Sequence, residues 1–333
     1  RKGYSMNIFD FTIRRVLYFL PVILLVNLLT FFLFFVLNPP DMMAKKILGD
    51  KNVTPEAIEK WKKDHSYHLP RVFNSEENGF SKITQTIFVQ KSARLLKFDF
   101  GKSDRNNLDI GKEIRHRMVP SLTITVPMLF LSLIVCISTA LIVAFYRGTY
   151  VDLWALVLCV FMMSVSMLFY IIGGQFIFGK LLKLFPISGY ESGIYSWKFV
   201  FLPVLVGVIS GIGASVRFYR TIFLEEINKD YIRTARSKGL SERVILFKHC
   251  LKNAMIPLLT NIVMSIPFLF MGSFLLEIFF GIPGLGNFTI EAIDAQDFAI
   301  VRSMVFLGSL LYIVGLILTD ISYTLVDPRI RFK

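Results

Sequence analysis

Charged residues are scarce in this chain of 333 residues, at 18% against about 25% in an average soluble domain. Cysteine is scarce too, with three residues, and the apolar content is 54%. The low cysteine count excludes a disulfide-stabilised miniprotein, and the apolar content excludes a disordered chain. Hydrophobic sequence is abundant instead, including 33 phenylalanines. This composition disfavours a soluble enzyme and is typical of a polytopic membrane protein.

Motifs for nucleotides, metals and catalysis are missing as well. No GxxxxGK[ST] loop occurs, so the chain is not expected to bind ATP in that way. Gly211 and Gly213 lack the third glycine of a dinucleotide fingerprint, and no HExxH or GxSxG occurs. We therefore expect no cofactor, no metal and no catalytic residue on this chain. A membrane-embedded enzyme stays an alternative without a catalytic constellation to support it.

Six stretches contain no Asp, Glu, Lys or Arg. They are residues 16–40, 118–146, 153–179, 199–216, 253–276 and 303–319. A helix needs about 20 apolar residues to cross a bilayer, and lipid admits only helices or closed barrels. Because the stretches are continuous and do not alternate, they predict an all-α polytopic membrane protein with six transmembrane helices, the first over residues 16–37.

Basic residues predict the orientation of these helices. The segments on the side of both termini carry 17 Lys and Arg, and the two short loops opposite carry four. The positive-inside rule therefore places the N-terminal residues 1–15 and the C-terminus in the cytoplasm. Residues 38–120 exceed the roughly 60 residues for which the rule counts, so they are interpreted as an extracytoplasmic domain. Residues 121–333 then form the main transmembrane domain, helices two to six.

Within the extracytoplasmic domain, Thr54 is a good N-cap for a helix that begins at Pro55. A second group of polar residues lies in the outer loop 277–302, where acids concentrate. They are Glu277, Glu291, Asp294 and Asp297. The preferred interpretation of these four acids is a solvated loop.

Ionisable residues are almost absent from the spans, which argues against a proton-driven carrier. Uncharged polar residues do occur there. The candidate pore-lining residues are Asn27, Thr30, Ser164, Gln175, Asn261 and Ser265. For each of them, helix packing is the alternative.

The predicted cytoplasmic loop 217–252 has the pattern of two helices around a glycine. Phe223, Ile227, Tyr231 and Ala235 recur every four residues, as on one face of a single helix. Gly239 suits the C′ position after that helix, because glycine tolerates positive φ. Ser241 suits the N-cap of a second helix, over 242–252, which continues into the fifth span. Such a loop either lies on anionic lipid or docks on a partner, and its acids-then-bases order favours docking.

Residues 230–257 resemble the cytoplasmic loop of B-type permease subunits of ABC importers of the oligopeptide/dipeptide/nickel group. The run RTAR at 233–236 and Gly239 carry this resemblance, although the Glu of the wider superfamily is absent. Four further elements follow the family's order: FGKS at 100–103, FPISGY at 185–190, Glu277 with FGIPGLG at 280–286, and DPRIR at 327–331. The resemblance covers most of residues 8–333 and is weakest over 65–97.

The resemblance implies a permease subunit in the bacterial cytoplasmic (inner) membrane. Its expected partners are a homologous C-type permease, two ATPase subunits that bind ATP and Mg, and an extracytoplasmic solute-binding protein that meets the domain at 38–120. That domain could alternatively be a packed cap without a contact role. Peptides are the leading substrate, with nickel or another small complex as the alternative. A secondary carrier or channel is the less favoured reading.

In this family the cytoplasmic loop is the coupling helix that fits a groove of the ATPase. The residues that the resemblance assigns to that contact are Glu225, Glu226, Asp230, Tyr231, Arg233, Thr234, Ala235, Arg236 and Gly239. The net charge of +13 is then explained by orientation and docking, and nucleic acid is not an expected partner.

Overall fold

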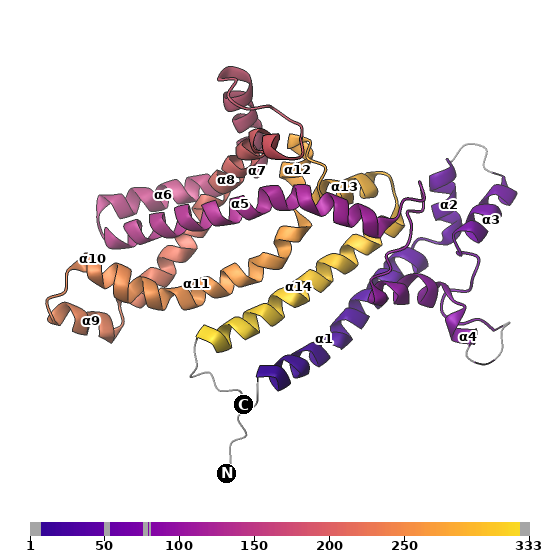
Figure 1. Cartoon of the computed structure of the whole chain (residues 1–333), viewed down its shortest axis with the longest axis horizontal. Coiled ribbons are helices and arrows are strands. Elements are labelled where there is room, and N and C mark those ends of the chain that lie inside the picture. The colour runs from indigo at the N-terminus through magenta and orange to yellow at the C-terminus, as the bar shows by residue number, and fades with distance from the viewer. Residues whose placement is uncertain (1–7, 50–53, 76–78, 80, 327–333) are drawn as a thin grey trace, which may run out of the picture. The chain divides into compact units, whose positions relative to one another are not determined.

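The computed structural model describes residues 8–49, 54–75, 79 and 81–326, and Figure 1 shows the course of the chain. Within these residues the fold is helical, as predicted, and the one β-type feature is an isolated bridge between Lys102 and Asp109. The first half comprises α1 (Ile8–Phe31), η1 (Phe32–Val36), α2 (Pro40–Leu48), α3 (Pro55–Asp64), α4 (Ser81–Thr84), η2 (Phe88–Ser92), η3 (Ala93–Lys97), α5 (Ile110–Phe145), α6 (Tyr150–Ser164), α7 (Met167–Gly174) and η4 (Gln175–Leu181).

The second half of the chain is helical as well. In both halves the label η marks a 3-10 or π-helical segment. It comprises η5 (Ile194–Ser196), α8 (Trp197–Ile227), α9 (Asp230–Ser237), α10 (Glu242–Val244), η6 (Ile245–Cys250), α11 (Leu251–Ser265), η7 (Ile266–Met271), α12 (Phe274–Phe280), α13 (Leu285–Asp294) and α14 (Phe298–Val326).

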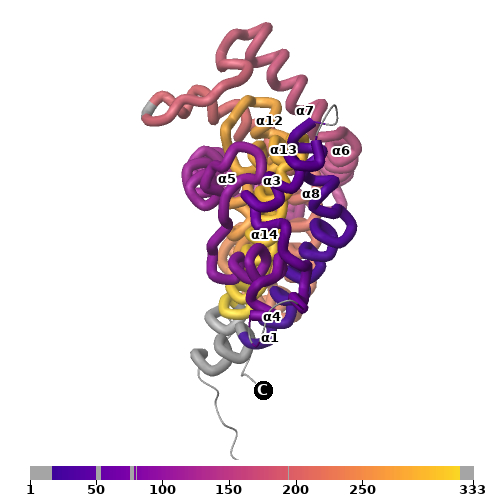
Figure 2. Tube along the Cα trace, turned by 90° about the vertical axis from the view of Figure 1, so that its right-hand side faces the viewer, coloured from indigo at the N-terminus to yellow at the C-terminus, as the bar shows by residue number. Residues whose placement is uncertain are grey.

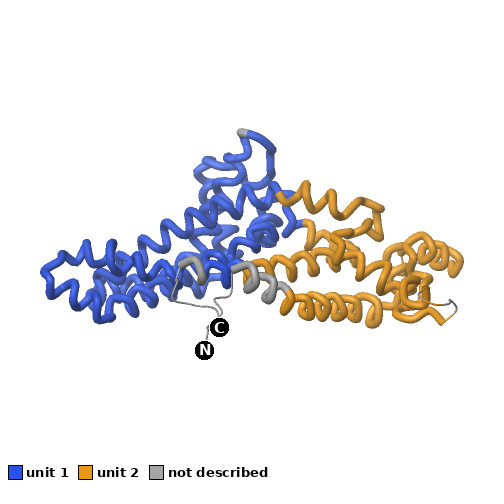
Figure 3. Tube along the Cα trace, turned by 60° about the horizontal axis from the view of Figure 1, so that its bottom comes forward, with its two compact units in different colours: residues 1–5, 119–287, 318–333 blue, residues 6–118, 288–317 orange. Residues whose placement is uncertain are grey.

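The chain divides into two compact units, coloured separately in Figure 3. Unit 1 contains residues 119–287 and the C-terminal segment from 318. Unit 2 contains residues 6–118 and 288–317. The helices α5 and α14 contribute residues to both units. Each unit is described by itself below.

Five helical segments are long and apolar enough to cross a membrane. They are Leu17–Val36, Ile110–Phe145, Trp197–Ile227, Glu242–Met271 and Phe298–Ser322. Each coincides with one of the predicted spans, but most extend beyond the charge-free stretch, because charged residues such as Arg217 and Arg220 continue a helix readily. Large apolar side chains such as Ile134 and Phe161 are 65% exposed, as expected of surfaces that face lipid.

The third predicted span is not one straight helix. Residues 153–179 fall on α6 and on α7 with η4, and the two parts meet at an angle of 89°. Val165 is extended at the break, and the Ser166 hydroxyl accepts a hydrogen bond from the Leu168 amide at 3.4 Å, so it caps α7. Hydropathy does not detect this break, because the residues on both sides are equally apolar.

The predicted boundary between the fifth span and the outer loop is also corrected. The fifth segment ends at Met271, before Gly272 with φ +73°, and not at 276. The predicted loop 277–302 is largely helical, since it holds the end of α12, all of α13 and the start of α14. The helices α12 and α13 meet at 83°.

In unit 1, the helices α6 and α8 pack closely, because glycine on α8 leaves no side chain between them. A Cβ placed on Gly213 would lie 2.6 Å from the Cys159 carbonyl oxygen on α6. Arg220 of α8 donates two hydrogen bonds of 2.8 Å to the Asp152 carboxylate on α6. The connection between η4 and α8 forms an extended loop (Figure 2).

In unit 2, aromatic residues form the core. Trp61 on α3 stacks on Tyr67 with ring centroids 5.2 Å apart, and Tyr67 lies 5.6 Å from Phe35. The helix α3 begins as predicted, with Pro55 in its first turn and with the Thr54 hydroxyl accepting a hydrogen bond from the Ala57 amide at 3.3 Å. This cluster attaches α2 and α3 to the η1 segment.

Candidate coupling site

The loop at 217–252, predicted to be cytoplasmic, begins with a break that the sequence pattern did not reveal. The predicted single helical face from Phe223 to Ala235 is wrong, because α8 ends at Ile227 and α9 begins at Asp230. Lys229 is extended at the N-cap of α9, with φ −72° and ψ 152°. The four-residue spacing survives this break, since Phe223, Ile227 and Ala235 are all buried.

Glu226 holds the corner between α8 and α9. Its side chain accepts hydrogen bonds of 2.5 Å from the Lys229 ammonium and from the Tyr231 hydroxyl. Glu226 is only 6% exposed. Burial, and then the bond to Glu226, raises the pKa of Tyr231, so the phenol stays a neutral donor. Glu226 therefore fixes the corner from within and does not lie on the outer surface of the loop.

The short helix α9 is amphipathic, and its two faces have different roles. Ile232 and Ala235 are buried in the core of unit 1. The remaining candidate coupling residues are exposed, apart from the half-buried Tyr231. The exposed ones are Glu225, Asp230, Arg233, Thr234, Arg236 and Gly239. This face offers both charge signs, with Arg233 and Asp230 3.4 Å apart.

Gly239 ends α9 as predicted. Its φ is +74°, and its amide donates to the Arg236 carbonyl at 2.9 Å, while the Leu240 amide donates to the Ala235 carbonyl at 3.4 Å. A Cβ on Gly239 would meet nothing within 4 Å. The requirement for glycine here is thus one of backbone conformation and not of space.

An ion pair bridges the turn after Gly239. The Arg236 guanidinium donates to both carboxylate oxygens of Glu242, at 2.7 and 3.1 Å. This interaction raises the pKa of Arg236. Ser241 has the extended backbone of an N-cap, but its side chain makes no capping hydrogen bond. The predicted second helix exists as α10 and η6, and it runs into α11 without interruption.

A second site in unit 1 surrounds Glu277, which is fully buried. Its Oε1 accepts from the Ser121 hydroxyl at 2.8 Å and from the Ser273 amide at 3.2 Å, and its Oε2 accepts from the Asn287 amide at 2.9 Å. The Ser121 oxygen also accepts from the Leu285 amide at 2.8 Å. The carboxylate thus joins α5, α12 and α13.

Three glycines make room for this carboxylate. A Cβ on Gly272 or Gly284 would overlap the Glu277 carboxyl group, and a Cβ on Gly286 would lie 2.9 Å from its Oε2. The glycine-rich run at 280–286 therefore packs its backbone directly against the buried Glu277 carboxyl group. It also receives the 185–190 element, because the Gly189 amide donates to the Phe280 carbonyl at 2.7 Å.

The prediction of a solvated acidic loop is wrong for Glu277 and Asp297. In unit 2, Asp297 is 3% exposed; it binds the Ser103 hydroxyl and accepts from the Ile300 amide at 3.3 Å. Ser103 belongs to the 100–103 element, which this contact attaches to the start of α14. Asp294 is exposed as expected, and Glu291 pairs with Arg117 at 3.0 Å. Charge alone did not distinguish the buried acids, Glu277 and Asp297, from the exposed acids, Glu291 and Asp294.

The predicted pore-lining residues are divided between the two units. In unit 2, the Asn27 amide donates to the Ser92 carbonyl at 2.9 Å and Thr30 donates to the Asn27 carbonyl at 2.9 Å, both buried. In unit 1, the Gln175 amide bridges the carbonyls of Ile187 and Phe279, at 2.9 and 2.8 Å.

The serines and the second asparagine of this set lie in unit 1. Ser164 and Ser265 donate to carbonyls of their own helices, at 2.9 and 2.7 Å. Asn261 is exposed on α11. The DPRIR element at 327–331 lies outside the described residues. Among the residues that were searched, no three His, Cys, Asp or Glu side chains are placed to hold a metal ion.

Several helices long and apolar enough to span a membrane, among them two joined through a helix–glycine–helix loop, are typical of a multi-pass membrane protein. The chain belongs to the family of binding-protein-dependent transport system inner membrane components, whose model matches residues 136–332. Members of this family are transport subunits of the inner membrane and not enzymes.

Individual relatives match nearly the whole chain. A protein of Brucella abortus named as a peptide transport system permease is 31% identical over 325 residues, 96% of this chain and 98% of its own length. The glutathione transport system permease protein GsiC of Salmonella typhimurium is 30% identical over 97% of this chain and 99% of its own. A peptide ABC transporter permease of Sinorhizobium fredii is 32% identical over 77% and 83%.

Proposed function

We propose that this chain is the B-type permease of an ATP-driven peptide importer and forms half of its translocation path with a C-type permease. The observation that carries the substrate assignment is the full-length similarity to proteins named for peptide and glutathione transport. Nickel or another small complex is the alternative cargo. Two ATPase subunits hold ATP and Mg, and an extracytoplasmic binding protein delivers the cargo to the domain at 38–120.

In the proposed topology, the bent pair of α6 with α7 and η4 counts as one span, which gives six. Both termini and the loop 217–252 are cytoplasmic, in line with the surplus of Lys and Arg on that side. The bent pair of α12 and α13 would be a re-entrant element on the outer side. The irregular backbone of such an element is tolerated at membrane depth because it is covered by protein.

Coupling is proposed to act through α9 as a rigid body. The Glu226 hydrogen bonds connect α9 to α8, and the Arg236–Glu242 pair connects α9 to α10. A push on the exposed face of α9 is therefore transmitted to both adjoining helices. Closure of the ATPases on ATP would supply that push and switch the spans from inward-facing to outward-facing.

The pore proposal is narrowed to Asn261. It is exposed on a candidate span, whereas the other predicted residues are hydrogen-bonded within their own unit. For Asn27, Thr30 and Gln175 these bonds favour the alternative of helix packing.

Uptake by the complete transporter tests the proposed function. The chain is reconstituted into vesicles with its partner permease, the ATPases and the binding protein, and uptake of labelled glutathione, a dipeptide and nickel is followed. We expect peptide uptake that requires ATP and persists when a protonophore removes the proton gradient. Uptake of nickel alone would replace the substrate assignment, and uptake driven by the proton gradient without ATP would contradict the importer class.

A further inference from the structure

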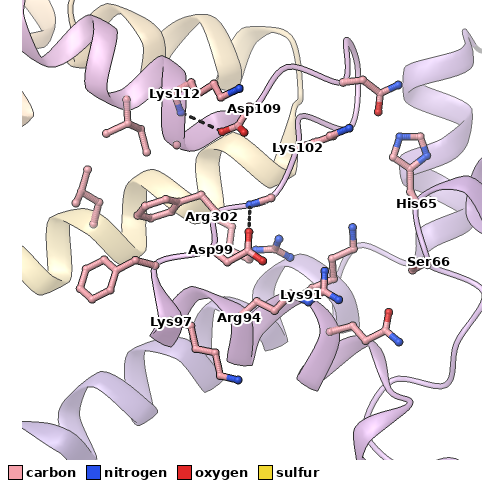
Figure 4. A pocket seen from close by; sticks show the side chains of 18 of the residues that line it. His65, Ser66, Lys91, Arg94, Lys97, Asp99, Lys102, Asp109, Lys112 and Arg302 are labelled. Atoms are coloured by element: carbon pink, nitrogen blue, oxygen red, sulfur yellow. Dashed lines mark hydrogen bonds between the residues drawn. The ribbon is translucent and has the colours of Figure 1, made fainter.

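A basic pocket of about 970 Å³ lies within unit 2 (Figure 4). Its volume is in the range of sites that hold small ligands. The residues lining it include seven Lys or Arg side chains and three Asp. Figure 4 shows Lys91, Arg94 and Lys97 on one side of the pocket and Lys102 and Lys112 on the other.

The three acids of the pocket, Asp64, Asp99 and Asp109, offset less than half of this positive charge. The Asp99 carboxylate accepts from the Gly101 amide at 3.1 Å, and the Asp109 carboxylate accepts from the Lys112 amide at 3.0 Å. Both serve backbone groups of their own turns. Among the described residues, none of the seven cationic side chains forms an ion pair within 4.0 Å.

Arg302 is the strongest indication that the pocket binds an anion. It is 3% exposed, lines the pocket from α14, and its Nε is buried without a hydrogen-bond partner among the described residues. Its guanidinium lies 5.1 Å from the centroid of Phe35. A buried guanidinium with an open donor is costly unless an anion reaches it.

Two nearby carboxylates are already engaged elsewhere. Asp104 accepts from the Tyr67 hydroxyl at 2.9 and 2.8 Å, and Asp297 binds Ser103. Lys91 lies beside this group, with its Nζ 4.7 Å from the centroid of Tyr67. Burial lowers the pKa of Lys91, which a bound anion would oppose. The Asp104 charge raises the pKa of Lys91 in turn, but among the described residues neither Lys91 nor Arg302 forms an ion pair within 4.0 Å.

Apolar side chains complete the lining. Phe98 is 61% exposed, and Phe100, Ile114 and Leu307 also face the pocket. Ile114 and Leu307 belong to segments apolar enough to span a membrane. Cationic and apolar groups therefore meet near the ends of spanning helices, where lipid phosphates lie next to acyl chains.

We propose that the pocket is a phosphate site for the head group of an anionic phospholipid, with Arg302 and Lys91 holding the phosphate and Phe98 and Leu307 contacting the acyl region. This proposal rests on the membrane placement of α5 and α14 and is independent of the transported substrate. The occupied site would connect the 88–102 segment to the start of α14 through the lipid.

Native mass spectrometry of the purified full chain in detergent tests this proposal. The probes are phosphatidylglycerol, phosphatidylcholine and inorganic phosphate, each titrated separately. We expect one phosphatidylglycerol to be retained in preference to phosphatidylcholine. Arg302→Gln and the exposed Arg94→Gln should each weaken that binding about fivefold, since each cation contributes about 1 kcal/mol. The matched control is Arg71→Gln, an exposed arginine of unit 2 outside the pocket.

Arg94→Gln keeps the test decisive if Arg302→Gln does not fold, because Arg94 is a surface residue. Equal retention of both lipids, or an equal loss in Arg71→Gln, would overturn the proposal. Binding of inorganic phosphate with no lipid preference would overturn the phospholipid assignment. None of these outcomes depends on peptide uptake, so they are distinct from failure of the proposed function.

Discussion

Unit 1 contains two glycine-bearing turns in which glycine is required for different physical reasons. Gly239 has a positive φ and open space where a side chain would be. Gly284 and Gly286 have no such φ, but a Cβ on either would run into the Glu277 carboxyl group. One glycine sets a backbone angle at an exposed elbow, and the others leave room for a buried charge. Substitutions at the two turns should therefore fail in different ways.

Removal of the buried acid should have the largest effect. Glu277→Leu leaves the Ser273 and Asn287 amides and the Ser121 hydroxyl without their acceptor. At about 1–3 kcal/mol for each unsatisfied donor, the loss of stability should reach about 3 kcal/mol or more. Thermal unfolding of the detergent-purified chain measures it. Glu225→Leu, at an exposed glutamate of the same unit, is the control. Equal melting temperatures for the two variants would show that the hydrogen bonds of Glu277 do not stabilise the fold.

A methyl group added next to the Glu277 carboxyl group should cause the second-largest loss of stability. Gly284→Ala forces its Cβ into the Glu277 carboxyl group, and overpacking of this kind costs about 1–3 kcal/mol. In Gly239→Ala the new Cβ has no atom within 4 Å, so the only cost is the positive φ, about 1–2 kcal/mol of stability. The same unfolding assay should therefore show the larger loss for Gly284→Ala. The reverse order would mean that space does not explain the glycine-rich run.

At Gly239, a substitution should lower the ratio of transport to ATP hydrolysis more than it lowers the stability of the chain. Gly239→Val places a β-branched residue at φ +74°, which is strongly disfavoured, and should change the angle between α9 and α10. We expect the variant to remain in the membrane with its ATPases, to allow ATP hydrolysis, and to lose most uptake. The ratio of transport to ATP hydrolysis in reconstituted vesicles is the measurement. Normal uptake would refute the role of the elbow.

The smallest effect is expected at the exposed ion pair. Arg236→Gln breaks the contact with Glu242, whose side chain is 49% exposed, so the loss of stability should be at most about 1 kcal/mol. A double-mutant cycle with Glu242→Gln gives the interaction energy, with Arg233→Gln as a neighbouring control. A coupling energy far above 1 kcal/mol would show that the elbow is more rigid than its exposure indicates.

Hydropathy and spacing predicted the features that depend on local sequence. Five of the six predicted spans as long apolar helices, the α3 N-cap at Thr54 and the positive φ of Gly239 follow from composition and from the preferences of single residues. The resemblance to the family also drew attention to the 100–103 and 280–286 elements. What these elements do could not be predicted, because Ser103 finds Asp297 and Glu277 finds Ser121 far away along the chain.

The sequence patterns failed where tertiary contacts decide. The bend between α6 and α7 lies in uniformly apolar sequence, so only the serines at 164 and 166 hint at it. The break between α8 and α9, at Asn228 and Lys229, preserves the four-residue spacing of apolar residues, so that spacing could not predict it. Glu226, expected on the docking surface, is instead drawn inward by Lys229 and Tyr231. For the basic pocket, the sequence contains seven cations spread over more than 200 residues, and only folding brings Arg302 to Lys91.

The central claim is that the exposed face of α9 is the contact with an ATPase. A photo-crosslinking residue at Thr234, which is exposed on that face, tests it in membranes that contain the complete transporter. The same probe at the exposed Ser192 of unit 1, outside the loop, is the control. We predict an adduct with the ATPase subunit from position 234 and none from position 192. Absence of the adduct at 234, or equal adducts at both positions, would contradict the claim.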